Sequence, residues 1–259
     1  SKQPSQDQLT LQSYPNLENV RSGKVSLQDY LNYIFESLPE AREARKSGIL
    51  KGLVYNPTDK KLEELLRESI LGLPIANQRE ILCLFEEGYK TREKIAAVAP
   101  NVLGRRIPLY VIFTDSLLSE QVIQNDADVK SIARHELQHV RDQYYGIELP
   151  GIFLTDETAK NRIRPDFLNQ LQELRAVNRE LYDVFRERLA SGAFSISKDF
   201  FGAKASEYAA HWEFIKNYPV VELEKRVREL QFEEFKGIVP ETRQEGIYLK
   251  FNLFGETST

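Results

Sequence analysis

Apolar residues recur every three to four positions along much of this chain, and that spacing predicts amphipathic helices. The clearest helix begins at Ser26, a good N-cap residue, has Asp29 in the capping-box position, and ends before Pro39. The charged stretch 40–47 is expected to be helical or solvated. The same periodicity predicts helices over 59–70, 77–85, 91–99, 130–142, 167–190, 200–216 and 220–236, and a short helix over 157–163.

Three segments have the β-branched and aromatic content of strands, namely 49–55, 107–114 and 247–254. Pro108 cannot donate to a ladder, so the segment 107–114 is expected to lie at a sheet edge or to begin a strand there. A free edge could hold an extended peptide by strand addition, and an ordinary core strand is the alternative. Many helices with few strands predict the α+β class, with a small sheet beside the helix over 130–142.

The composition is ordinary for a globular protein and excludes several classes of partner. Of the 259 residues, 41% are hydrophobic and 29% are charged, the net charge is −4, and no dense Lys/Arg tract occurs. Nucleic acid and anionic membrane surfaces are therefore not expected partners. No apolar run approaches the roughly 20 residues of a membrane span, so we expect no span and a soluble chain.

Cysteine and methionine usage adds two expectations. Cys83 is the only cysteine, which excludes an intrachain disulfide, and its apolar neighbours predict a buried thiol. Methionine is absent, so we expect Ser1 to follow processing, either removal of an export signal or simple trimming. The compartment stays open.

The strongest chemical signal is the H-E-x-x-H arrangement of His135, Glu136 and His139. Residues four apart on a helix share one face, so both imidazoles can bind one metal ion at roughly 2.0–2.1 Å. Glu136 leaves the helix beside His135 and can reach a water on that ion without being a ligand, which is the geometry for activating water. Two chance histidines on a surface helix are the alternative, but the apolar positions of this segment predict a core helix.

A catalytic zinc ion needs three protein ligands and one position for water. The metzincin pattern would continue with glycine at 142 and histidine at 145, where this chain has Asp142 and Tyr145. The chain instead resembles the gluzincin group of zincin metallopeptidases, in which a downstream glutamate on a second helix completes the site. The resemblance covers about a quarter of the chain and rests on the H-E-x-x-H residues and the E-x-x-A-like segment Gln172-Glu173-Leu174-Arg175-Ala176.

This resemblance implies that Glu173 is the third zinc ligand, beside His135 and His139. Glu180 lies two turns further along the same helix face, about 10 Å away, so a straight helix cannot bring both glutamates to one ion. The alternatives that stay open for the third ligand are Glu157, Glu180 and His211.

The chain departs from the gluzincin pattern at one position. Several gluzincins carry an aspartate four residues after the ligand glutamate, where it orients a histidine, and this chain has Val177 there. The carboxylate that orients a histidine must then come from elsewhere. Asp142, one turn beyond His139, is a possible substitute, and a solvated acid at a helix end is the alternative.

The resemblance also implies a tyrosine or histidine that hydrogen-bonds the oxyanion of the tetrahedral intermediate. Tyr208 and His211 lie three residues apart on one expected helix face, and either can take this role. A packed tyrosine and a satisfied core histidine beside Trp212 are the alternative.

The resemblance therefore implies a zinc-dependent peptidase that acts on a peptide or protein substrate, with Zn²⁺ as cofactor and Glu136 as general base. Two alternatives stay open: a metal-dependent hydrolase of a non-peptide amide or ester, and a zincin-derived binding or regulatory protein with little catalysis.

We expect a polar arm over 1–24 and one zincin-like domain over 25–259. Within that domain, 25–106 is a helical N-terminal part and 107–259 is the catalytic part. Cleavage preference and oligomeric state stay open.

Overall fold

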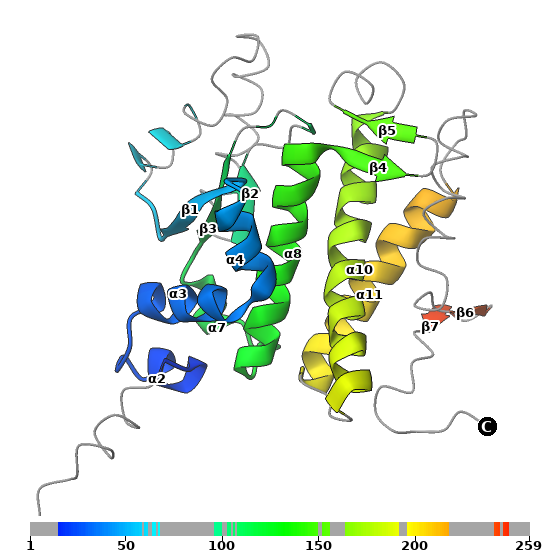
Figure 1. The fold of residues 1–259 in the computed structure, drawn as a ribbon. Coiled ribbons are helices and arrows are strands. Elements are labelled where there is room, and N and C mark those ends of the chain that lie inside the picture. The colour runs from blue at the N-terminus through cyan, green and yellow to red at the C-terminus, as the bar shows by residue number, and fades with distance from the viewer. Residues whose placement is uncertain are drawn as a thin grey trace, which may run out of the picture.

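The structure is a computed structural model that describes most of the chain. Helices dominate the described part and strands form small sheets, so the α+β class is confirmed (Figure 1). No helix in this part is both long and apolar enough to cross a membrane. The described residues are 15–58, 96–99, 108–149, 152–155, 164–191, 196–217, 241–243 and 246–248, with a few single residues between 60 and 106.

Helix α8, Asp126–Tyr145, carries the H-E-x-x-H residues and begins earlier than the sequence predicted. A capping box fixes its start: the Asn125 side chain accepts from the backbone N–H of Asp128 at 2.9 Å, and the Asp128 carboxylate accepts in return. The helix ends at Gly146, whose φ is +86°. A Cβ there would lie 2.6 Å from the carbonyl oxygen of Leu154, so only glycine fits this turn.

The main sheet has three strands in the order β1-β3-β2. Strand β3, Leu109–Phe113, pairs in parallel with β1, Leu50–Tyr55, and antiparallel with β2, Ala96–Ala99. The predicted strand over 107–114 is therefore confirmed; of the two places that Pro108 allowed, the structure has the strand beginning and not the sheet edge. Both of its sides are paired, so no peptide can add to it, and Pro108 stands just before the ladder, where its missing N–H costs nothing.

The prediction of a helix over 91–99 is wrong at Ala96–Ala99, which forms strand β2. Its alanines favour a helix by intrinsic propensity, but hydrogen bonds to β3 override that weak preference. The helical prediction for the preceding residues lies outside the described part of the chain.

The N-terminal region begins with α2, Leu17–Arg21, which lies inside the predicted arm over 1–24. Leu17 and Val20 are buried, so this part of the predicted arm packs against the domain. Helix α3, Leu27–Ser37, is capped by Ser26 as predicted, and α4, Pro39–Lys46, shows that the charged stretch is helical.

Two long helices, α10 (Pro165–Ser191) and α11 (Lys198–Asn217), confirm the predictions over 167–190 and 200–216. Shorter elements are α7, Ser116–Ser119, and the strand pairs β4–β5 (Ile147–Leu149 with Ile152–Leu154) and β6–β7 (Glu241–Arg243 with Gly246–Tyr248). Strand β7 overlaps the predicted strand over 247–254. The described part does not include the predicted helices at 77–85, 157–163 and 220–236, or Cys83.

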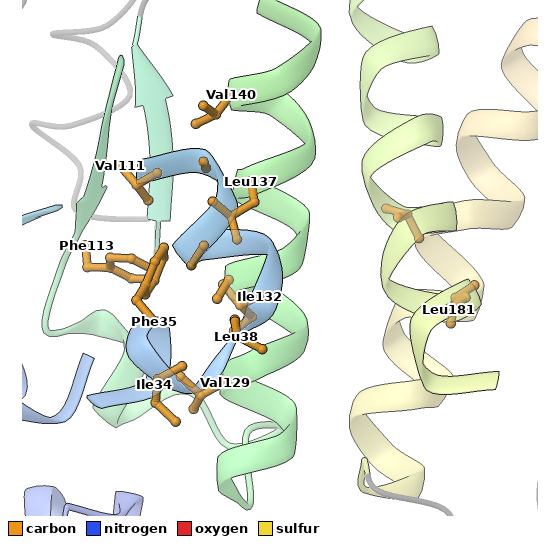
Figure 2. Close-up of a cluster of buried hydrophobic side chains, with 14 of the residues drawn as sticks. Ile34, Phe35, Leu38, Val111, Phe113, Val129, Ile132, Leu137, Val140 and Leu181 are labelled. Atoms are coloured by element: carbon orange, nitrogen blue, oxygen red, sulfur yellow. The ribbon is translucent and has the colours of Figure 1, made fainter. Parts of the chain in front are cut away.

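One face of α8 packs on α3, α4 and the sheet, and the other face lies against α10 (Figure 1). In the first interface the Phe35 ring meets the Phe113 ring edge to face, with centroids 5.7 Å apart, beside Leu137 of α8 (Figure 2). This apolar contact holds one side of α8 in place, which leaves its other side for polar residues.

Replacing Phe35 by alanine should therefore lower the free energy of unfolding by about 3–5 kcal/mol, because the change removes a fully buried ring and leaves a cavity. Chemical denaturation measures this. The control is Phe153→Ala on β5, where a half-exposed ring should matter far less. Equal losses in the two variants would contradict the assignment of the core.

Candidate metal centre

His135, His139 and Glu173 meet between α8 and α10. The two imidazole Nε2 atoms lie 3.1 Å apart, and the Glu173 carboxylate oxygens lie 3.3 Å from His139 Nε2 and 3.4 Å from His135 Nε2. Ligand atoms around a tetrahedral ion with bonds of about 2.0–2.1 Å are about 3.3–3.4 Å apart. Each histidine nitrogen thus faces its own Glu173 oxygen, and one ligand atom from each of the three residues lies within 4.8 Å of the other two, so this group could hold a metal ion.

Helix packing explains why Glu173 reaches both histidines. Helices α8 and α10 run antiparallel (Figure 1), and α10 carries a buried apolar stripe that includes Leu171, Leu174 and Val177. Ala176 is fully buried one turn after Glu173, where its small side chain lets the two helices approach closely. The structure therefore brings to the two histidines the glutamate that the resemblance implied as third ligand.

The predicted alternatives for the third ligand lie elsewhere. Glu180 contacts His135 through the other ring nitrogen, Nδ1, at 2.6 Å from its Oε1. His211 lies near Glu173 but is not part of the His135–His139–Glu173 group. Glu157 lies outside the described residues.

Glu180, and not Asp142, is the carboxylate placed to orient His135. It is 0% exposed, and its contact with Nδ1 favours the tautomer that carries the proton there, so Nε2 is left with a lone pair for a metal. Asp142, the predicted substitute, does something else. Its buried carboxylate accepts from Arg175 Nε at 3.0 Å and from Gln138 Nε2 at 2.8 Å, which ties α8 to α10.

Charge couples the histidines to the carboxylates. Burial by itself would lower the pKa of His135, but the negative charges of Glu180 and Glu173 outweigh it and raise that pKa to about 10. For Glu173, burial would raise the pKa, yet the two histidines hold it well below its usual range. Without a metal ion, the centre therefore holds a proton on His135 that a metal must displace.

Glu136 lies beside this centre and is 7% exposed. Burial raises the pKa of its carboxyl group, while the adjacent histidines act in the opposite direction. A carboxylate made more basic in this way is suited to accept a proton from water.

Lys204 and Glu207 of α11 form, with Glu180 and Glu173 of α10 and His135 of α8, a layer of charged and polar side chains that we call the polar layer. Neither Lys204 nor Glu207 was predicted from the sequence. The Lys204 ammonium lies 3.0 Å from Glu207 Oε2 and 3.5 Å from Glu180 Oε1. Burial would lower the pKa of Lys204, but these carboxylates raise it, so the ammonium stays charged. The signal was available: positions 204, 207 and 211 share one face of the predicted helix.

His211 is positioned by this layer. Its Nδ1 contacts Gln170 Oε1, and its Nε2 lies 3.8 Å from Glu207 Oε1. One donor atom from each of Glu173, Glu207 and His211 lies within 4.8 Å of the other two. His211 therefore lies next to the set of His135, His139 and Glu173, which we call the metal group. Burial would raise the pKa of Glu207, but His211 and Lys204 lower it to about 2.

Tyr208, the other predicted oxyanion donor, belongs to the hydrophobic core and is 1% exposed. Burial raises the pKa of its hydroxyl group. The role of Tyr208 as oxyanion donor stays a prediction, whereas the position of His211 beside Glu173 fits that role.

A cavity of about 290 Å³ opens beside His135 and Glu136. Helix α8 forms one wall, α11 forms the opposite wall, and the segment after α7 closes the end that lies away from the metal group. The lining residues are Glu120, Val122, Ile123, Ile132, His135, Glu136, Phe200, Ala203, Lys204 and Glu207.

No protein-family model, curated protein or solved structure matches the chain. The chemistry of the centre is therefore argued from its own residues.

Replacing Glu173 by alanine should abolish tight metal binding, because it removes a direct ligand. Glu180→Ala should weaken binding by about 10–100-fold, since it removes the carboxylate that orients His135. Isothermal titration with zinc measures both effects, and Glu18→Ala, which removes an exposed carboxylate of α2, is the control. Tight binding retained by the Glu173 variant would contradict the ligand assignment.

The raised pKa of His135 predicts how metal affinity depends on pH. The protonated ring cannot be a ligand, so below a pKa of about 10 each binding event releases this proton. The apparent zinc affinity should therefore rise about tenfold per pH unit for each proton released between pH 6 and 9. Competition with a chromophoric chelator, corrected for the chelator's own titration, tests this, and an affinity that does not change with pH would contradict it.

Proposed function

We propose that this protein is a zinc-dependent peptidase in which Glu136 is the general base. The observation that carries the proposal is a buried glutamate beside two imidazoles and a carboxylate whose ligand atoms lie close enough together to hold one metal ion. A structural zinc site is closed by four protein ligands, whereas a catalytic site keeps one position open. Here the group supplies three donors, the Glu173 side chain is 29% exposed, and a cavity begins at His135, which favours an open fourth position.

The donor set supports zinc as the metal. Two imidazole nitrogens and one carboxylate form the set found in many hydrolytic zinc sites, while calcium and magnesium prefer oxygen ligands alone. Zinc, when bound, supplies positive charge that makes water more acidic and polarises a substrate carbonyl group.

Glu136 moves the proton in this proposal. Its carboxylate accepts a proton from the attacking water as the oxygen adds to the peptide carbonyl carbon. The resulting carboxylic acid then donates that proton to the departing amine as the C–N bond breaks. Burial raises the pKa of Glu136, which makes its carboxylate a better proton acceptor than an exposed glutamate.

His211 stabilises the negative charge that develops on the carbonyl oxygen. A ring N–H pointed at that oxygen acts in the transition state more than in the ground state, which is what accelerates the chemical step. Gln170 Oε1 contacts Nδ1 and holds the imidazole near Glu173, while Nε2 lies 3.8 Å from Glu207 Oε1, beyond hydrogen-bond distance, and is the nitrogen that would donate to the carbonyl oxygen. Its position beside the metal group favours His211 over Tyr208 for this task.

A peptide is the favoured substrate for two reasons. The cavity beside Glu136 has a volume of about 290 Å³, close to the lower limit of the roughly 300–1,000 Å³ of ligand pockets, so it has room for a side chain of a bound peptide. The ligands and the base also match the gluzincin resemblance, including the glutamate on a second helix.

Glu136→Gln tests the proposal, because it keeps the shape of the side chain and removes the base. Zinc content should stay near one ion per chain while peptide hydrolysis falls by about 10²–10⁴-fold. Cleavage is followed by mass spectrometry of a peptide library, with metal analysis of the same samples. Hydrolysis that survives in this variant, or in wild-type protein stripped of metal, would refute the mechanism.

A further inference from the structure

The cavity beside Glu136 has charged groups at both ends and apolar walls between them. Lys204 and Glu207 lie at the end near the metal group. Phe200 comes seven residues before Glu207, about 10 Å back along α11. The start of α11 lies against the segment after α7, since Gln124 donates to the Asp199 carboxylate at 2.7 Å. Glu120 belongs to that segment and therefore marks the far end of the cavity.

The two charged ends differ in how well they are neutralised. At the near end the Lys204 ammonium is already paired with Glu180 and Glu207. At the far end the half-buried Glu120 carboxylate meets only the backbone N–H of Val122, at 3.5 Å, which is long for a hydrogen bond. Of the three lining glutamates, Glu207 is paired with Lys204 and Glu136 is the proposed general base, so in the described part of the chain Glu120 is the remaining carboxylate, and it has no ion pair.

The segment that carries Glu120 is held firmly by the N-terminal region. The Arg21 guanidinium of α2 donates to the backbone carbonyl oxygens of Leu118, Glu120 and Ile123 at 3.3, 3.3 and 2.7 Å. These bonds go to carbonyl groups, so they fix the position of the segment and leave the Glu120 carboxylate available to a ligand.

We infer that this cavity binds a lysine or arginine side chain of the substrate and that Glu120 pairs with its charge. The inference rests on the proposed peptidase function and names its specificity. The long stem of such a side chain would lie along Val122, Ile132 and Phe200, as lysine and arginine stems commonly lie on apolar surfaces. The guanidinium or ammonium group would then reach Glu120, where a charge-assisted hydrogen bond forms.

The charge balance of the cavity favours a cation over an anion. With all groups ionised, three glutamates and one lysine line it, a formal balance of −2 when His135 is neutral. An acidic side chain would face Glu120, Glu136 and Glu207, and the one ammonium present is already shared. An uncharged side chain of the same length would fill the walls but leave the Glu120 carboxylate without a partner.

The test compares blocked peptides, Ala-Ala-X-Ala-Ala, in which X is arginine, lysine, norleucine or glutamate. Zinc-loaded full-length protein should cleave the arginine and lysine peptides beside X with kcat/KM about 10–100-fold above the norleucine peptide, the range of a charge-assisted contact. In Glu120→Gln this ratio should fall to within about threefold, and Glu120→Lys should favour the glutamate peptide. Preference for norleucine over arginine, or a ratio unchanged in both Glu120 variants, would overturn the inference.

Two controls separate this inference from the proposed function. Glu43→Gln removes an exposed carboxylate of α4 and should leave rates and ratios unchanged. Binding of the same peptides to the zinc-loaded Glu136→Gln variant measures recognition without turnover. An arginine preference in binding that Glu120→Gln abolishes would support the cavity assignment even if no peptide were cleaved. Cleavage that requires Glu136 but ignores the charge of X would refute only the specificity.

Discussion

The carboxylate of Glu180 is fully buried among α8, α10 and α11, where a charge is stable only while it is paired. Its partners are His135 Nδ1 at 2.6 Å and Lys204 Nζ at 3.5 Å, one from each neighbouring helix. The pairing fixes the distance between the helices and the rotation of the His135 ring together. Any change that separates the helices leaves a charge without a partner, so the polar layer resists loosening even though it contains few apolar contacts.

The opposite face of α8 allows this polar layer to exist. A layer of charged side chains contributes little net stability, because the removal of charges from water offsets most of their mutual attraction. The fold therefore depends on the apolar interface, where Phe35 and Phe113 pack beside Leu137. Helix α8 carries both faces, which places the H-E-x-x-H residues on a rigid element whose position is set by the core rather than by the site.

Local periodicity was enough to predict the helices that build the site. The helix with His135 and His139, its partner helix with Glu173, and α11 all have a clear 3.6-residue pattern. The structure has α10 and α11 within two residues of the predicted bounds, whereas α8 extends beyond its predicted bounds at both ends. Prediction failed where pairing between distant segments decides the structure. Ala96–Ala99 has the composition of a helix but is recruited by β3, and β3 resembles an edge strand because nothing in its own residues indicates that β2 would pair with it. Lys204 was missed because a lone lysine on a helix usually indicates a solvated face.

The spacing of Glu173 and Glu180 shows which arrangements helix geometry excludes and which it allows. Seven residues separate them, about 10 Å along the helix, which correctly excludes a site in which both bind one ion. It does not exclude a shared partner, because an imidazole ring has two nitrogens that point in different directions. His135 places Nε2 at 3.4 Å from Glu173 and Nδ1 at 2.6 Å from Glu180, so one ring spans the gap between the two carboxylates. The carboxylate placed against the second nitrogen of His135 thus lies seven residues beyond Glu173, and Val177, four residues beyond Glu173, packs in the core.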